Sequence, residues 1–334
     1  MSSILCMPAQ DIHFSQLNTT PLFLNSASAG AMGQDYRASL HYKGQWNSIA
    51  GSYKTMGVSV DGKILKQGRD KKNSLSAGLT ILSDKAGISK INSLEVHGHA
   101  AYNLFVTRSQ QFSAGFNVGF IQQSISVLNL KWDNQFDGNT YDASRATGEN
   151  TNFQKTLSLD LGAGILWKLQ PKHSPVKLEI GFAIAHIGGT KNSFYRNNYK
   201  TPIKYNLNIN PSVKLGSAPL IISPQLYYAL QAPYKELITG IGIKYLLGQD
   251  SREGFLNTYS LSSSSLAVNI YYRIKDALIL MLSYEYKKTI GFNVSYDYNI
   301  SSLNNATQKR GGMEISMLFK NFYRQSGLSK IPVD

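Results

Sequence analysis

Residues 265–300 have the sequence SLAVNIYYRIKDALILMLSYEYKKTIGFNVSYDYNI, in which apolar and polar side chains alternate in three successive runs. Large apolar side chains occupy every second position in Leu266–Ile274, Leu278–Tyr286 and Ile290–Tyr298. A period of two places successive side chains on opposite faces of a β-strand. The breaks between the runs have room only for tight turns, so the stretch predicts three strands of an antiparallel meander.

The length of these runs separates membrane-crossing strands from those of a soluble sandwich. Soluble strands commonly have about five or six residues, whereas about nine to eleven tilted residues cross a bilayer. The three runs have the second length. One face carries aliphatic side chains that end in tyrosines, and the other carries Asn269, Arg273, Lys275, Ser283, Glu285, Asn293, Ser295 and Asp297. We therefore predict one face toward lipid and one toward a polar lumen.

The composition narrows the class of membrane protein. Of the 334 residues, 42% are hydrophobic and 16% are charged. No run approaches the eighteen or more apolar residues of a transmembrane helix, which excludes a helical membrane protein. The 20 tyrosines and 28 glycines suit a barrel with aromatic girdles and small lumen-facing residues.

The net charge of +14 could suggest nucleic acid as a partner. However, the basic residues are spread through strands and loops and form no clustered arm, which argues against nucleic-acid binding. We interpret the charge as a basic surface that faces anionic lipid or an acidic partner.

The same alternation recurs along the rest of the chain and predicts about fourteen strands, an even number as in bacterial outer-membrane barrels. The further runs lie at residues 36–43, 56–60, 75–81, 96–104, 112–120, 157–167, 178–184, 203–209, 220–228, 241–247 and 313–319. Pro224 interrupts one of them, although proline removes a ladder hydrogen bond. Residues 61–63, 67–70 and 83–87 are predicted hairpin connections, and residues 129–155 an extended loop outside the hydrocarbon layer.

Lipid offers no hydrogen bonds to an open sheet edge, so the last strand must pair with the first. We predict an all-β chain: a transmembrane antiparallel β-barrel over residues 36–319, an N-terminal coil over 10–33 and a C-terminal tail over 320–334. Residues 10–334 then form a single outer-membrane domain. A soluble, lipocalin-like barrel is the alternative, but its closed core would have to hold much polar surface.

Residues 1–9 form a short apolar run that resembles the end of a secretory signal without its basic part. Cys6 is the single cysteine, which excludes a disulfide framework and a four-cysteine metal site. Lipidation of Cys6 is an alternative that the preceding Ile4 and Leu5 fit poorly.

The sequence contains no motif of nucleotide, metalloprotease or esterase chemistry. Glu95, His97 and His99 lie on one side of a predicted strand, with the two histidines about 7 Å apart. This spacing suits a metal or acid–base pair, but polar residues lining a wet lumen are the simpler interpretation.

Asp133, Asp137 and Asp142 could bind calcium, yet they match no EF-hand spacing and also suit turns. We predict no catalytic residue, metal or cofactor. A hydrolase in the lumen or a loop stays open as an alternative.

Several short motifs occur in one order: Gln10–Gln16, Pro21–Asn25 with Ala29-Gly30, Tyr42–Trp46, Asp84–Gly87, Trp132–Asp137 and Gly311–Ser316. Together they resemble the PorP/SprF family of Bacteroidetes membrane proteins over nearly the whole chain. Thr20 stands where the family pattern has asparagine, and Ser26 where it has proline, which concerns only the local geometry of the coil.

The resemblance implies an integral barrel of the bacterial outer membrane that belongs to the type IX secretion and gliding motility machinery. The resemblance implies one of two roles: docking periplasmic ring or peptidoglycan-linked components, or helping to export and anchor a secreted surface protein such as an adhesin. Outer-membrane lipids are further implied partners, and no catalysis is implied. A passive or substrate-specific pore is the alternative function. Candidate partner-binding or plug residues are Phe14, Gln16, Pro21, Leu24, Asn25, Gly30, Trp132, Asp133, Gln135 and Asp137.

Overall fold

The computed structural model describes residues 11–45, 53–67, 73–87, 91–125, 130–148, 155–171, 174–189, 200–247, 264–301 and 310–322. The expected signal remnant at 1–9, the turn at 68–70 and most of the C-terminal tail lie outside these ranges.

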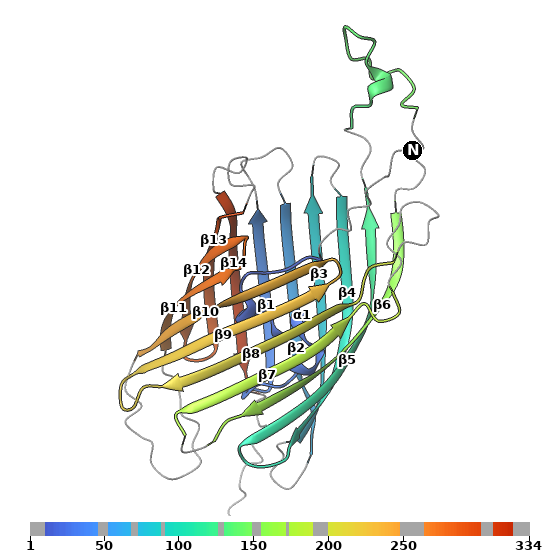
Figure 1. Cartoon of the computed structure of the whole chain (residues 1–334). Coiled ribbons are helices and arrows are strands. Elements are labelled where there is room, and N and C mark those ends of the chain that lie inside the picture. Colours follow the sequence, from blue (N-terminus) through green and yellow to red (C-terminus); the bar gives the residue numbers. More distant parts are fainter. Residues whose placement is uncertain are drawn as a thin grey trace, which may run out of the picture.

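Fourteen antiparallel strands close into one barrel, because β1 pairs with both β2 and β14 (Figure 1). The strands are β1 (Tyr36–Gln45), β2 (Tyr53–Gln67), β3 (Asn73–Ala86), β4 (Ile91–Phe105), β5 (Gln110–Ser124), β6 (Lys155–Leu169), β7 (Val176–Ala185), β8 (Lys204–Lys214), β9 (Leu220–Gln231), β10 (Tyr234–Leu247), β11 (Ser264–Arg273), β12 (Ala277–Tyr286), β13 (Ile290–Asn299) and β14 (Arg310–Asn321). The predicted barrel and its number of strands are confirmed.

The two faces of the wall have opposite character. In β11 the outward side chains Leu266, Val268 and Ile270 are between 46% and 49% exposed. The inward side chains Asn269 and Arg273 are 8% and 3% exposed. An apolar outer face with a polar interior is the arrangement of a barrel surrounded by lipid. Among the described helices, none is long and apolar enough to cross a membrane.

Two of the predicted hairpin connections are wrong. Residues 61–63 lie inside β2, and residues 83–86 belong to β3. Gly62 pairs with Tyr36 on one side and Ala77 on the other, so neighbouring strands supply the backbone partners that a turn would otherwise provide. The ladder shifts its register only beyond this point, between Lys63 and Leu65.

Pro224 does lie within a strand, as predicted. Its register partner in β10 is Ile241, whereas the β8–β9 ladder has no paired residues between Ile209–Leu226 and Val213–Ile222. The missing N–H therefore falls where the ladder is already interrupted, which is where proline is tolerated in a sheet.

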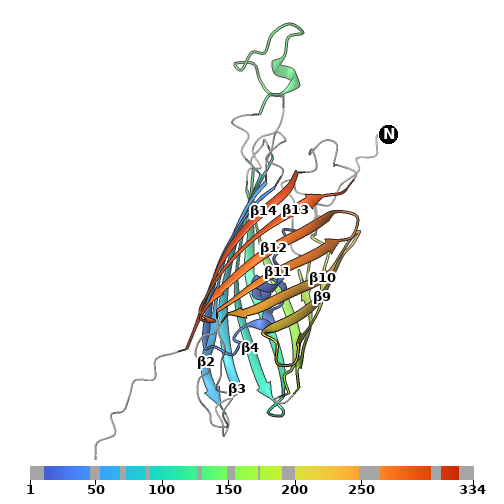
Figure 2. The ribbon, with the colours of Figure 1, turned by 90° about the vertical axis from the view of Figure 1, so that its left-hand side faces the viewer.

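Residues 11–35, which we call the luminal coil, lie inside the barrel (Figures 1 and 2). They contain the 3₁₀ turns η1 (Leu17–Thr19) and η2 (Ser26–Ser28) and the short helix α1 (Pro21–Leu24). Asp11 pairs with His186 just beyond β7, at the end of the barrel from which residues 130–148 project. At the opposite end, the N–H of Asp35 donates to the carbonyl of Asn321. The coil thus crosses the lumen from end to end.

Candidate functional site

The luminal coil holds its own shape through local hydrogen bonds. Proline at the first position of α1 has a backbone angle suited to a helix start. Asn25 ends α1 and caps η2, because its side-chain oxygen accepts the N–H of Ala27 at 2.9 Å. Thr19 and Thr20 both donate to the carbonyl of Gln16. These bonds give a segment without apolar periodicity a defined fold inside the barrel.

Glu314 of β14 is the principal anchor of the coil. Its carboxylate accepts the backbone N–H of Ser15 at 2.6 Å and that of Gln16 at 3.1 Å. It also pairs with Lys43 of β1 at 3.0 Å, and both side chains are almost fully buried. The Gln16 side chain donates to the Ser295 hydroxyl and to the carbonyl of Glu314. Several donors thus satisfy one buried charge, as burial in a low-dielectric interior demands.

A second anchor surrounds Arg273 of β11. The Ser15 hydroxyl donates to Asp297 at 2.5 Å, and the guanidinium contacts the same carboxylate at 3.2 Å. Arg273 also pairs with Glu236 at 3.1 Å and Asp276 at 2.9 Å. Three carboxylates around one arginine hold the wall and the coil in one network.

On the opposite wall, glycines allow the coil to approach the strands closely. A Cβ atom added to Gly115 of β5 would lie 2.7 Å from the backbone of Ser26 and Ala27. Similarly, a Cβ atom at Gly164 would overlap the Asn25 side chain. The Asn25 amide donates to the carbonyl of Ile165 at 2.9 Å. These strand glycines therefore fit the coil into the wall rather than serving as simple small lumen residues.

Near the opposite end, Asp61 of β2 fixes the last part of the coil. It accepts the N–H of Gly30 at 2.8 Å and a two-pronged contact from Arg37 at 2.8 and 3.0 Å. Gly30 has a φ of 62°, and a Cβ atom there would overlap Ser76. Glycine is thus required at this position for both backbone and space.

Apolar contacts complete the seat of the coil. Leu17 packs in a buried cluster with Tyr227 and Tyr271, and Leu24 packs against it. The Phe14 ring lies 5.7 Å from Phe23 and 5.3 Å from His41, measured between centroids. The coil thus touches wall strands all around the barrel.

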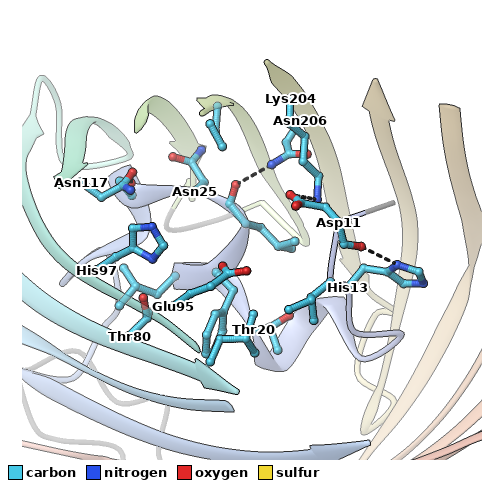
Figure 3. A pocket seen from close by; sticks show the side chains of 18 of the residues that line it. Asp11, His13, Thr20, Asn25, Thr80, Glu95, His97, Asn117, Lys204 and Asn206 are labelled. Atoms are coloured by element: carbon cyan, nitrogen blue, oxygen red, sulfur yellow. Dashed lines mark hydrogen bonds and ion pairs between the residues drawn. The ribbon is translucent and has the colours of Figure 1, made fainter. Parts of the chain in front are cut away.

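Cavities remain on both sides of the coil. One of about 100 Å³ lies toward the loop end and is lined by Asp11, Glu95, His97, Asp160 and Lys204, among others (Figure 3). Another of about 380 Å³ lies toward the opposite end and is lined by cations including Lys168 and Lys177.

A chain of ionisable side chains borders the smaller cavity. His186 donates through Nδ1 to Asp160 at 2.8 Å and through Nε2 to Asp11 at 2.9 Å. Burial alone would lower the pKa of His186, but the two carboxylates outweigh it and raise the pKa to about 10. Burial alone would raise the pKa of Asp11, but Lys204 and His186 hold it below its usual value. The start of the coil is therefore tied to the wall by ion pairs.

The three side chains Glu95, His97 and His99 do share the lumen side of β4. His97 contacts Asp160 at 2.8 Å, and His99 contacts Thr80 at 2.9 Å and Ser26 of the coil at 3.3 Å. In the described part of the chain, no group of three or more His, Cys, Asp or Glu side chains is arranged so that it could hold a metal ion. The histidines act here as hydrogen-bonding members of the wall.

Residues 130–148 form a separate, ordered loop clear of the barrel (Figure 1). Gln135, which is 5% exposed, lies at its centre and donates to the carbonyls of Ala143 and Arg145. Its side-chain oxygen accepts from Tyr141 and from the N–H of Trp132. The 3₁₀ turn η3 (Asp133–Gln135) starts this arrangement.

The aspartates of the loop serve its turns. Asp137 accepts the N–H groups of Asn139 and Thr140 at 2.8 and 2.6 Å, and these bonds lower its pKa. Asp142 likewise accepts from the hydroxyl and N–H of Ser144. Turn formation accounts for these side chains, whereas Phe136 is left 54% exposed.

The candidate residues thus fall into two groups. Six lie in the lumen: Phe14, Gln16, Pro21, Leu24, Asn25 and Gly30. Four lie in the projecting loop: Trp132, Asp133, Gln135 and Asp137. Sequence reasoning missed the partners Asp61, Asp160 and Glu314 in the wall. The sequence alone could have indicated these three residues, because an acidic residue within a transmembrane strand requires a partner.

Solved structures that are similar to this chain include outer-membrane barrels. A deletion mutant (deltaS2S3) of the TodX monoaromatic hydrocarbon channel has a TM-score of 0.51 at 9% identity, covering 90% of this chain and 94% of that one. A Pseudomonas aeruginosa FadL homologue has a TM-score of 0.50 at 8% identity, with coverage of 90% and 94%. At such identities the likeness shows the fold alone.

Among curated proteins, none matches the chain. The family described as type IX secretion system membrane protein PorP/SprF matches residues 7–319. The family is one of secretion-system membrane proteins, and the fold is that of an outer-membrane barrel. The protein is therefore an integral outer-membrane β-barrel that belongs to the PorP/SprF family of type IX secretion system membrane proteins.

Proposed function

We propose that this barrel is a non-catalytic docking protein that helps to export or anchor a secreted surface protein, and that residues 130–148 make the contact. The observation that carries this proposal is the order of the loop around a buried Gln135, which leaves aromatic side chains at its surface. A preorganised loop with exposed aromatic side chains binds with little loss of conformational entropy.

The lengths of the connections at the two ends of the barrel support a contact at the cell surface. The longest connection, residues 125–154, lies at the loop end together with residues 186–203, whereas the opposite end has one long connection, residues 248–263. The first residue of β1, Tyr36, and the last residue of β14, Asn321, pair with each other at the opposite end. In bacterial barrels the longer loops face the outside and the shorter turns face the periplasm. Residues 130–148 then face the cell surface.

The luminal coil supports docking over passive transport. It contacts strands on every side of the lumen, and Ser15, Gln16, Ala27 and Ala29 are fully buried. A lumen filled in this way is expected to pass little steady current. The coil residues among the candidates therefore act as a plug in this proposal.

Affinity isolation in mild detergent tests the docking role. The intact barrel should recover a type IX component or a secreted surface protein. Phe136→Ala and Gln135→Ala should each reduce that recovery about five-fold or more, since central aromatic contacts contribute about 1 kcal/mol or more to interfaces. The first removes an exposed ring, and the second removes the centre of the loop.

Val106→Ala provides the matched control, because Val106 is similarly exposed, at 58%, in the short turn between β4 and β5 at the opposite end. It should leave recovery unchanged. Equal recovery by all three variants would contradict the role of the loop, and repeated isolation without any secretion component or secreted surface protein would contradict docking itself.

A further inference from the structure

The outward face of the described strands carries very few charges. Those whose side chains the structure describes are Lys54, Lys85, Lys155 and Lys235. All four are lysines, and all four lie in the first or last two residues of a strand at the loop end. Every described acid in the strands faces the lumen, so no carboxylate on the wall balances these cations.

Three of the four form one row. Lys54 of β2 is directly opposite Lys85 of β3 in the strand register. Lys85 is opposite Asn92, Asn92 is opposite Ser124, and Ser124 is opposite Lys155 of β6. The strands β2 to β6 are consecutive neighbours in the wall (Figure 1). At about 4.8 Å per strand, the row covers roughly 19 Å of the rim.

The pair Lys54–Lys85 places two like charges side by side on the outer face. Directly opposed side chains on one face have Cβ atoms about 4.5–5.5 Å apart, and like charges there destabilise the sheet. Among the described residues, neither lysine has a hydrogen-bond or ion-pair partner. An anion that bridges the two ammonium groups would turn this repulsion into attraction.

The position of the row selects the anion. On the outer face, the lysines lie closer to the rim than apolar residues of the same strands. Examples are Met56, Ile81 and Leu157, which are 60%, 37% and 69% exposed and face lipid. Each lysine can therefore extend along the apolar wall and place its ammonium at headgroup level. An anion at that height, on the long-loop side of an outer membrane, is a phosphate of a membrane glycolipid.

We propose that Lys54, Lys85 and Lys155, with the polar side chains of Asn92 and Ser124 between them, bind the phosphate groups of an outer-leaflet phosphoglycolipid of the lipid A type. The site lies on the outer wall and is separate from both the luminal coil and the projecting loop. It would hold one side of the barrel against anionic lipid and fix the height of the barrel in the membrane.

Titration of the purified, delipidated barrel with diphosphoryl lipid A in neutral detergent tests this proposal. The double variant Lys54→Gln/Lys85→Gln should bind about 30-fold more weakly, because two lysines near an anionic surface are removed. Lys54→Arg/Lys85→Arg should bind as the unchanged protein does, which separates loss of charge from loss of fold.

Lys235→Gln is the matched control, since it removes a lysine from the same rim on the far wall, where its strand partner is Leu230. It should bind normally. Fully dephosphorylated lipid A should bind weakly to every form, and inorganic phosphate alone should not compete at millimolar concentration. Equal affinity of the double variant, equal binding of dephosphorylated lipid, or full competition by inorganic phosphate would each overturn the proposal.

Discussion

At the scale of single residues, a few buried carboxylates connect the coil to the wall. Glu314 and Asp61 bind the coil directly, whereas Asp160 binds His186, which pairs with Asp11 of the coil; each of the three carboxylates is 2% exposed. Removing one partner of a buried charge leaves the other uncompensated, which costs about 3–5 kcal/mol. The coil and the wall therefore depend on each other at these positions.

The His186 contacts predict how the start of the coil responds to pH. The raised pKa of His186 means that its imidazolium stabilises the seated coil fully below the usual pKa of 6.5 and loses this effect as pH rises through about 10. The lowered pKa of Asp11 means that its effect is present above 3.8 and lost as pH falls toward its folded value. Protection of residues 11–16 from hydrogen exchange, measured relative to an unstructured peptide at the same pH, should accordingly be high near neutrality and fall above about pH 10.

His186→Gln, which carries no charge at any pH, should exchange faster at neutrality and lack the alkaline transition. His41→Gln is the control, because His41 is buried beside Phe14 and contacts Ser39 rather than a carboxylate. It should keep the transition. A transition that persists in His186→Gln would assign it to another group near Asp11, such as Lys204.

At the scale of elements, the fit between the coil and β5 depends on a missing side chain. Gly115→Val would drive a side chain into the backbone of Ser26 and Ala27, so we expect the coil to leave its seat while the strands remain paired. Planar-bilayer recordings should show little steady current for the unchanged barrel and a several-fold larger conductance for the variant.

Gly98→Val is the matched control, since the nearest heavy atom to a Cβ added there is 3.8 Å away. Its conductance should equal that of the unchanged barrel. A folded Gly115→Val barrel with unchanged current would show that the coil does not close the lumen. A change in migration on SDS gels after boiling reports that the variant is folded.

The strands could be predicted from the sequence, whereas the place of the coil could not. A lipid-facing wall imposes a period of two, and that period is visible in each strand. The coil has no period, since its partners come from distant strands: Asn25 contacts Ile165, and Ser15 contacts Glu314. Which lumen residues meet it depends on closure of the whole barrel. The sequence predicts turns at residues 61–63 and 83–86 because their residue types are typical of turns. In the barrel, the neighbouring strands pair with these residues instead.

At the scale of the whole molecule, stability comes from a closed ring in which every strand pairs with two neighbours. The ring is completed by ten register pairs between β1 and β14, from Tyr36–Asn321 to Gln45–Gly312. Closure removes the sheet edges that lipid cannot satisfy. We therefore expect a heat-modifiable band in outer-membrane fractions, which migrates differently with and without boiling on SDS gels.

A chain truncated after residue 309 lacks β14 and should lose the compact, unboiled band, while Lys235→Gln should retain it. Recovery of the unchanged protein as a soluble monomer without detergent would contradict the membrane barrel.

The attachment of the coil to β14 also has a temporal consequence. Ser15 and Glu314 are 299 positions apart, and Gln16 and Ser316 are 300 apart. The N-terminal segment is synthesised first, but its main attachment point exists only when the last strand has been made. Seating of the coil against Glu314 therefore waits for completion of the ring, and an unfinished chain leaves residues 15 and 16 without these bonds and more accessible to proteases. The contact between the coil and β14 thus also records that assembly has finished.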